Sequence, residues 1–470
     1  MIADLKPYPD YVETGLLWLG QVPKNWRTDR LKNWVTMNAR VLPENTDKHY
    51  EFNYLDIGSV GTGWLAKRAK RQRFERAPSR ARRVLHQGDT IVSTVRPYLK
   101  AVLTIEGMTE PLIASTGFAV LTPSVGTQPR FVGYLAQSEP FINQVISESV
   151  GIAYPAISET NLGNIAVAIP PPAEQVTIAR FLDWANGRLE RTIRAKRKVI
   201  RLLSEQKQAI VHRAVTRGLS PTVPLKPSDI PWLGDIPQHW EVWLAKYLFH
   251  EVDERSIDGS EELLSVSHIT GVTPRSQKNI TMFKAKSYVG HKLCRPGDLV
   301  VNTMWAWAGA FGVSAYSGIV SPSYAVYRPF HLECYNGSYI DGLLRTRPYI
   351  SNIICRSTGL RSSRLRLYPE EFLRIPIIQP PIKEQQRIVE SIDSDTSGLQ
   401  STISHLEREI ELLREYRTRL VSDVVTGRLD VHDVAAHLPV DTIEPADNDA
   451  TLDNDELVDD SELNDEEVQV

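Results

Sequence analysis

The chain has 470 residues, too many for one hydrophobic core, so two or more domains are expected, and its three cysteines exclude a disulfide framework. Hydrophobic residues make up 42% and charged residues 24%, which is ordinary for a globular protein. The net charge of −3 conceals a basic body, because residues 1–430 carry 54 basic against 43 acidic side chains and thus favour a polyanionic partner.

The beginning of the chain lacks the apolar segment of a signal peptide, so the cytoplasm is the expected location. One stretch, 299–327, contains no charged residue and could be mistaken for a membrane span. It holds Asn302 and three glycines, which favour short buried strands joined by turns.

The chain repeats itself at an offset near 210 residues. Five segments of the first half return in the same order in the second half. They pair 18–26 with 232–240 (Trp-Leu-Gly-x-Val/Ile-Pro-x-x-Trp), 88–94 with 297–303 (both beginning Gly-Asp), 115–123 with 321–329, 169–175 with 378–385, and 214–219 with 424–429. This period is too long for a solenoid repeat, so each copy is expected to be a whole domain with an appendage.

Within each copy, two kinds of sequence alternate. Residues of about 15–170 and 230–378 are rich in Gly, Pro, Thr, Tyr and Val, with short apolar runs between turn residues. This pattern is typical of strand-rich domains with a few helices.

Residues of about 173–216 and 383–426 lack proline and carry apolar side chains at steps of 3, 4 and 7, the stripe of a long helix. Each segment follows a proline pair or triplet, a usual helix start. Such a helix would be roughly 65 Å long, and its narrow stripe needs a partner helix. We therefore predict an intramolecular coiled coil; the alternative is that each helix packs on its own domain.

The chain lacks the motifs of common nucleotide-using enzymes. It contains no Gly-Lys dipeptide, so an ATP-binding phosphate loop is excluded. Its Pro-Pro pairs lack the flanking polar and aromatic residues with which amino-methyltransferases hold a flipped adenine. The sequence His331-Leu-Glu-Cys334 fits no usual metal site. We therefore expect no catalytic residue, no metal and no cofactor in this chain.

A dense basic run occupies residues 67–83, where nine of seventeen side chains are Lys or Arg. Phosphate contact is the natural use of so much charge of one sign, and a solvated surface is the alternative. The second copy instead has a basic cluster at 356–366 and an aromatic patch at 304–307, which aligns with 94–100 of the first copy. The residues predicted to contact DNA are Arg68, Lys70, Arg71, Arg73, Arg96, Tyr98, Lys100, Asn302, Trp305, Trp307, Arg356, Arg361 and Arg364.

Up to about residue 430, the sequence resembles the specificity subunit of type I restriction–modification enzymes. The resemblance rests on the repeated Trp-Leu-Gly motif, the Gly-Asp segments at 88 and 297, and the Pro-Pro-x-Glu-Gln motif before each helix. It implies an α+β fold of two strand-rich target-recognition domains joined by two long antiparallel helices that form a coiled coil. The expected divisions are 1–172, 173–217, 218–382 and 383–430, followed by an acidic, disordered tail at 431–470 that is foreign to the family.

The resemblance also implies a function. A non-catalytic subunit would recognise a bipartite, asymmetric site in double-stranded DNA and position two methyltransferase subunits and two restriction (motor–nuclease) subunits. Those partners would use S-adenosylmethionine, ATP and Mg²⁺. The alternatives are a methylation-only complex and a coiled-coil scaffold that binds no DNA, and the basic run opposes the scaffold.

Overall fold

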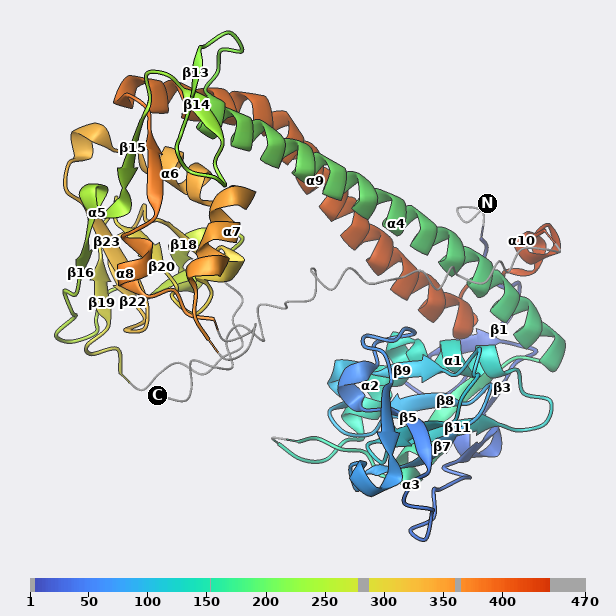
Figure 1. The fold of residues 1–470 in the computed structure, drawn as a ribbon. Coiled ribbons are helices and arrows are strands. Elements are labelled where there is room, and N and C mark those ends of the chain that lie inside the picture. Colours follow the sequence, from blue (N-terminus) through green and yellow to red (C-terminus); the bar gives the residue numbers. More distant parts are fainter. Residues whose placement is uncertain (1–4, 153, 278–286, 360–364, 440–470) are drawn as a thin grey trace. The chain divides into compact units, whose positions relative to one another are not determined.

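The computed structural model describes residues 5–152, 154–277, 287–359 and 365–439. These form two compact units (Figure 1). Unit 1 contains the described residues up to Lys196 together with 408–439, and unit 2 contains those of 197–407. Each unit thus holds one strand-rich domain and a part of both long helices, whereas the sequence divisions treat each helix as a separate segment.

Two four-stranded sheets form the centre of unit 1. One has the antiparallel order β4 (Val35–Met37), β11 (Phe118–Pro123), β8 (Thr90–Ser93), β9 (Val102–Thr104). The other has the order β6 (Lys70–Arg73), β5 (Glu51–Leu55), β10 (Leu112–Ser115), β7 (Ala81–Leu85), with β5 and β10 parallel. Shorter pairs and helices surround them: β1 (Tyr11–Glu13) with β2 (Gln21–Pro23), β3 (Arg27–Arg30) with β12 (Ala166–Ile169), α1 (Pro129–Gln137), α2 (Glu139–Ser147) and α3 (Glu159–Asn164).

Unit 2 repeats the first of these sheets, and the other strands that the structure describes there form pairs. Its main sheet has the order β16 (Phe249–Val252), β23 (Ala325–Pro329), β20 (Leu299–Val301), β21 (Phe311–Val313). The remaining elements are the pairs β13 (Leu225–Pro227) with β14 (Asp235–Pro237), β15 (Glu241–Leu244) with β24 (Pro376–Gln379), β17 (Leu264–Ser267) with β18 (Gly271–Pro274) and β19 (Lys292–Cys294) with β22 (Gly318–Val320), and the helices α5 (Ala245–Leu248), α6 (Gly337–Leu344), α7 (Arg347–Arg356) and α8 (Pro369–Phe372).

The uncharged stretch 299–327 forms buried strands, as the sequence predicts. Strand β20 and most of β23 have almost no exposed surface. Among the residues that the structure describes, no helix has the length and apolar character needed to cross a membrane.

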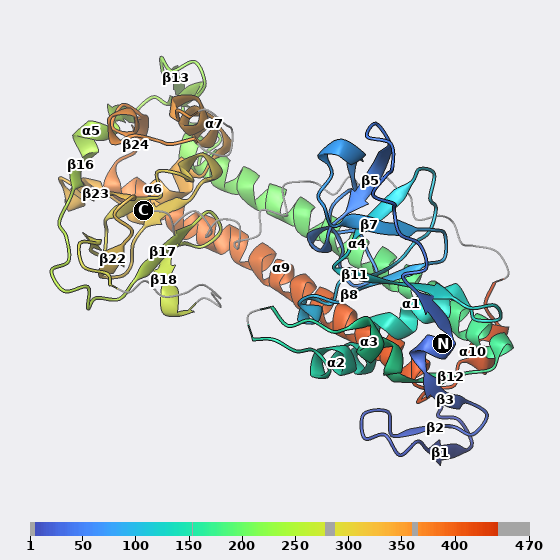
Figure 2. The ribbon, with the colours of Figure 1, turned by 90° about the horizontal axis from the view of Figure 1, so that it is seen from below.

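Two helices of more than forty residues dominate the α-structure: α4 (Pro172–Arg217) and α9 (Ile382–Val425). Their cross-contacts join Glu190 to Arg417 (3.4 Å) and Lys196 to Glu409 (2.5 Å) in unit 1, and Lys207 to Gln400 (2.7 Å) in unit 2. Residue numbers rise along one helix as they fall along the other, so the helices run antiparallel, side by side in both views (Figures 1 and 2). The predicted coiled coil is confirmed, and the alternative of unpaired helices is wrong.

Glycines in left-handed conformation end both helices. Gly218 (φ +73°) follows α4 and Gly427 (φ +75°) follows α9, so α9 stops before the expected limit at 430. Added Cβ atoms would lie 3.3 Å from Trp240 at Gly218 and 3.3 Å from Trp26 at Gly427. The end of α4 therefore packs in unit 2, and the end of α9 packs in unit 1.

The Glu-Gln pair that follows the prolines, Glu174-Gln175 in α4 and Glu384-Gln385 in α9, attaches the start of each helix to its own domain. Glu174 of α4 accepts hydrogen bonds from Trp26 Nε1 (2.9 Å) and Tyr8 Oη (2.7 Å). The amide oxygens of the fully buried Gln175 and Gln385 accept from the backbone N–H groups of Gln128 and Asn336, respectively. These motif residues form hydrogen bonds within the fold. Their repetition is therefore explained by the repeated structure of the two domains.

The segment that follows α9 corrects the predicted boundary of the tail. Val431, Ala435 and Leu438 are spaced i, i+4, i+7 and are buried in the core of unit 1, around the short helix α10 (His432–Ala436). Arg180 Nη2 donates to the Ala435 carbonyl at 2.8 Å and to the Leu438 carbonyl at 3.2 Å. Residues 431–439 thus belong to unit 1, and the rest of the predicted acidic tail, 440–470, lies outside the described residues.

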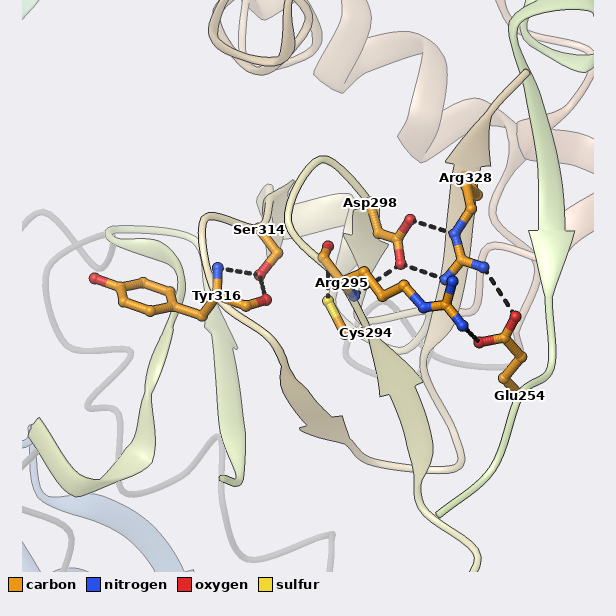
Figure 3. A network of polar contacts seen from close by, with 7 residues as sticks. All are labelled: Glu254, Cys294, Arg295, Asp298, Ser314, Tyr316 and Arg328. Carbon is orange, nitrogen blue, oxygen red and sulfur yellow. Dashed lines mark hydrogen bonds and ion pairs between the residues drawn. The ribbon is translucent and has the colours of Figure 1, made fainter. Parts of the chain in front are cut away.

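The repeated Gly-Asp pair holds the main sheet of each unit. In unit 2, Asp298 accepts two hydrogen bonds of 2.9 Å from Arg328, whose third nitrogen donates to Glu254 at 2.9 Å (Figure 3). Hydrogen bonding to Asp298 raises the pKa of Arg328 above its ordinary value. In unit 1, Asp89 accepts from Thr122 Oγ1 (2.7 Å) and from Arg40 (3.2 Å). Thr122 lies at the place of Arg328 on the matching strand, and the arginine that binds Asp89 comes instead from the segment after β4.

Candidate nucleic-acid interface

The predicted basic run begins on β6, at the edge of its sheet. Its register places Arg71 opposite Asn53 and Arg73 opposite Glu51, so the two arginines share one face. The Glu51 carboxylate accepts from Arg71 Nη2 at 2.7 Å and from Arg73 Nε at 2.9 Å. The hydrogen bond from Arg73, and next in size the one from Arg71, keep the pKa of Glu51 below its usual value. The carboxylate is therefore ionised at neutral pH and offsets part of the positive charge.

Lys70 lies on the opposite face of β6 from these arginines, and both Lys70 and Arg68 are exposed. The four predicted residues of this run therefore do not form one uniform surface. Charged side chains on an edge strand also oppose sheet-to-sheet association, which is the structural alternative for this run.

Three loops of unit 1 meet next to β8 and β9: 60–66, 94–101 and the described part of 148–156, which leaves out residue 153. Thr62 Oγ1 donates to the Lys100 carbonyl at 2.7 Å and joins the first loop to the second. The Arg96 N–H donates to the Pro155 carbonyl at 2.8 Å and joins the second to the third. We call these loops the three-loop surface of unit 1. It exposes the aromatic side chains Trp64, Tyr98 and Tyr154.

The middle loop carries three of the predicted residues. Tyr98 is half exposed, and Lys100 pairs with Glu139 of α2 at 3.2 Å. Arg96 places its guanidinium carbon 4.3 Å from the centre of the Tyr154 ring, a cation–π contact. The structure therefore brings Arg96 and Tyr98 onto one surface with Tyr154, which the sequence prediction missed.

Unit 2 has a matching three-loop surface at 267–271, 303–310 and the described part of 356–367. The 3₁₀ turn Ala306–Ala308 matches Pro97–Leu99 of unit 1, and each is followed by a residue with positive φ, Gly309 or Lys100. Arg345 joins the first two loops: its Nη1 donates to the His268 carbonyl at 2.7 Å and to the Gly309 carbonyl at 3.5 Å. The same framework thus presents different side chains in the two units.

Trp305 and Trp307 lie on this second surface, with stacked rings 5.2 Å apart. The Trp307 ring N–H is already used by the Met304 carbonyl at 2.9 Å. Arg356 is bound to Glu371 at 3.2 Å. The predicted residues Arg361 and Arg364 lie outside the described residues.

The prediction that Asn302 contacts DNA needs correction. Asn302 is buried, its amide nitrogen donates to Tyr324 Oη at 3.2 Å, and its oxygen accepts from the Met304 N–H. Both ends of the amide are therefore occupied in shaping the turn before Trp305. The sequence signal, a polar residue in an apolar run, did not distinguish a buried turn residue from a surface ligand.

Arg347 is a further exposed basic residue of unit 2. It is exposed at the start of α7 and has no ionic partner among the described residues. It is the middle residue of a Thr-x-Pro sequence, and the matching sequence of unit 1 is Ser138-Glu139-Pro140. An alignment of the two copies places Arg347 against Glu139, so the sequence alone could have shown that the charge at this position is reversed.

Residues 23–197 match the family model of the type I restriction modification DNA specificity domain. The putative type I restriction enzyme MjaX specificity subunit of Methanocaldococcus jannaschii is 24% identical over 233 residues, 48% of this chain and 52% of that protein. The MjaIX specificity subunit of the same organism is 23% identical over 179 residues, 37% of this chain and 40% of that protein. These matches span about half the length of the curated relatives or less.

A chain solved in a study of complex assembly and conformational transition of the type I R-M system shares the fold, with a TM-score of 0.59 and 20% identity over 86% of this chain and 98% of that chain. The two strand-rich domains on paired helices are thus a fold that this chain shares with that protein. The resemblance predicted from the sequence, to the specificity subunits of type I restriction–modification enzymes, is confirmed by the match of residues 23–197 to the model of the DNA specificity domain and by the similarity to the MjaX specificity subunit.

Proposed function

We propose that this chain binds double-stranded DNA and recognises a bipartite, asymmetric site, with one half-site read by each unit. The observation that carries this proposal is the matching pair of three-loop surfaces. Their shared turns hold Arg96 and Tyr98 in unit 1 but Trp305 and Trp307 in unit 2. Two three-loop surfaces that share a framework but present different side chains are suited to recognising two different half-sites.

We further propose that the chain itself is not catalytic and that its partners supply the chemistry. Two methyltransferase subunits would use S-adenosylmethionine, and two restriction subunits would use ATP and Mg²⁺. The two copies of the helix give two equivalent places for the methyltransferase subunits. A methylation-only complex fits the same geometry, and a restriction gene beside this one would decide between them.

The test is to produce the chain with its cognate methyltransferase subunit and to map methylated adenines in the host genome. We expect a complex of one copy to two and a two-part motif that disappears when this gene is deleted. Exchanging residues 94–101 for 303–310 should change one half-site only. Methyl transfer by the isolated chain, or an unchanged methylome after deletion, would contradict the proposal.

The basic run gives a second, independent prediction. Replacing Arg68, Lys70, Arg71 and Arg73 by Ala should weaken binding to any duplex and lower the salt slope by about 0.9 for each phosphate that the variant no longer neutralises. The Glu51→Gln variant should instead bind non-specific duplex more tightly, because it releases Arg71 and Arg73 from their carboxylate.

Both variants are measured by fluorescence anisotropy on random duplex DNA between about 50 and 200 mM salt, a range over which phosphate contacts weaken strongly. Glu44→Gln, which removes an exposed carboxylate outside this ion-pair group, is the matched control for net charge. Unchanged slopes in both variants would assign the run to the structural role of an edge strand.

A further inference from the structure

Arg96 has an unusual backbone conformation for an arginine. Its φ of +51° and ψ of +55° lie in the left-handed region, which side chains other than glycine rarely adopt. Two neighbours fix it there: the buried Pro97 begins the 3₁₀ turn, and the Arg96 N–H donates to the Pro155 carbonyl. Such conformations persist where the surrounding structure imposes them, and they cluster at ligand-binding sites.

The side chain of Arg96 is equally constrained. It is half-buried, its guanidinium stacks on the exposed ring of Tyr154, and its buried Nε has no hydrogen-bond partner. Among the described residues, no carboxylate or carbonyl accepts from this guanidinium. The described part of the fold therefore gives the guanidinium of Arg96 no acceptor of its own, as expected for a group whose acceptors come from a ligand.

Other arginines of unit 1 show the contrast. Arg71 and Arg73 share Glu51, and Arg130 is bound to Asp183 at 2.5 Å. Arg96 is held by stacking alone, which orients the plane of the guanidinium and leaves its donors available. A planar fork held in this way suits a base edge with two adjacent acceptors better than a single phosphate oxygen.

We propose that Arg96 is a specificity-determining residue that contacts the O6 and N7 acceptors of a guanine, and that Tyr154 is the residue that positions it. This inference rests on the proposed function. It states that the half-site read by unit 1 contains a G·C pair recognised through Arg96, since bidentate contact with guanine is the commonest specific use of arginine in the major groove.

Unit 2 reads the corresponding position differently. Trp305 follows β20 at the position that Arg96 has after β8, and its ring stacks on Trp307. An indole has one N–H donor and no acceptor, so it cannot make the bidentate contact. The asymmetry of the site thus has a structural origin at positions 96 and 305.

The experiment uses the complete complex with the cognate methyltransferase subunit and a panel of duplexes. The panel carries the wild-type motif with each base pair of both half-sites substituted in turn. For Arg96→Lys, which keeps the charge but loses the fork, we expect discrimination at one G·C pair of one half-site to fall roughly 5- to 150-fold. Tyr154→Ala should relax the same pair, and Tyr154→Phe, which keeps the ring, should behave like the wild type.

Arg27→Lys, at an exposed arginine of β3 outside the basic run and the three loops, is the matched control and should leave the discrimination unchanged. Uniform weakening over the panel with a lower salt slope would make Arg96 a phosphate contact and overturn the inference. No change in Arg96→Lys, or failure of both Arg96→Lys and Tyr154→Ala to bind any duplex, would also overturn it. A wild-type complex without sequence preference would instead overturn the proposed function.

Discussion

Replacing Arg328 by Met should destabilise unit 2 by about 3–5 kcal/mol, because the change leaves a buried carboxylate without its counter-ion. The side chain of Asp298 is only 2% exposed, and Arg328 supplies two of its hydrogen bonds. The third bond, from the Arg295 N–H at 2.9 Å, cannot compensate for the missing charge. Arg328 also pairs with Glu254, so the segment that follows β16 loses this ion pair with β23 (Figure 3).

The equivalent change in unit 1, Arg40→Met, is the matched control and should cost clearly less. The side chain of Arg40 is 38% exposed and contacts Asp89 through one nitrogen, while Thr122 and the His86 N–H still donate to that carboxylate. Hydrogen exchange measured by mass spectrometry separates the two units. Faster exchange in β20 and β23 for Arg328→Met alone is the expected result; equal effects of both variants would show that burial of the carboxylate is not decisive.

Lengthening both long helices by seven residues should lengthen the spacer of the DNA site and leave both half-sites unchanged. Seven helical residues add about 10.5 Å, which is about three base pairs. Seven residues also turn the apolar stripe by only about 20° from its register. The reason for the expected effect is that the antiparallel helices would set the distance between the two readers.

The structure decides where such an insertion belongs. Directly after Pro172 it would separate Gln175 from the Pro170 carbonyl, to which its Nε2 donates at 2.9 Å. Insertions between Lys196 and Lys207 in α4, and between Gln400 and Glu409 in α9, keep the existing cross-contacts on either side.

The readout is the methylome of cells that carry the altered gene. Seven residues inserted in α4 alone should abolish methylation, because the two helices would no longer match in length. Changed half-site bases at constant spacing in the double insertion would contradict a role of the helices in spacing.

Much of the fold could be predicted because its signals are local or repeated. The apolar stripe of each helix follows from a period of 3.6 residues, and the offset near 210 residues identifies two copies of one domain without any knowledge of contacts. The basic run at 67–83 is likewise visible in the sequence as charge. Periodicity and charge are properties of neighbouring residues, so the sequence alone determined them.

The partners of individual side chains depend on contacts between distant segments, and only the tertiary structure decided them. Register alone places Arg73 beside Glu51, so two residues that the sequence predicts to contact phosphate also form ion pairs within the fold. Burial turns Asn302 from a candidate ligand into a turn residue. Tyr154 and Arg96 are 58 positions apart and meet because the loops before Ile157 and after Ser93 are hydrogen-bonded. Pairing of this kind has no local signature in the sequence, since it depends on which strands and loops the fold brings together.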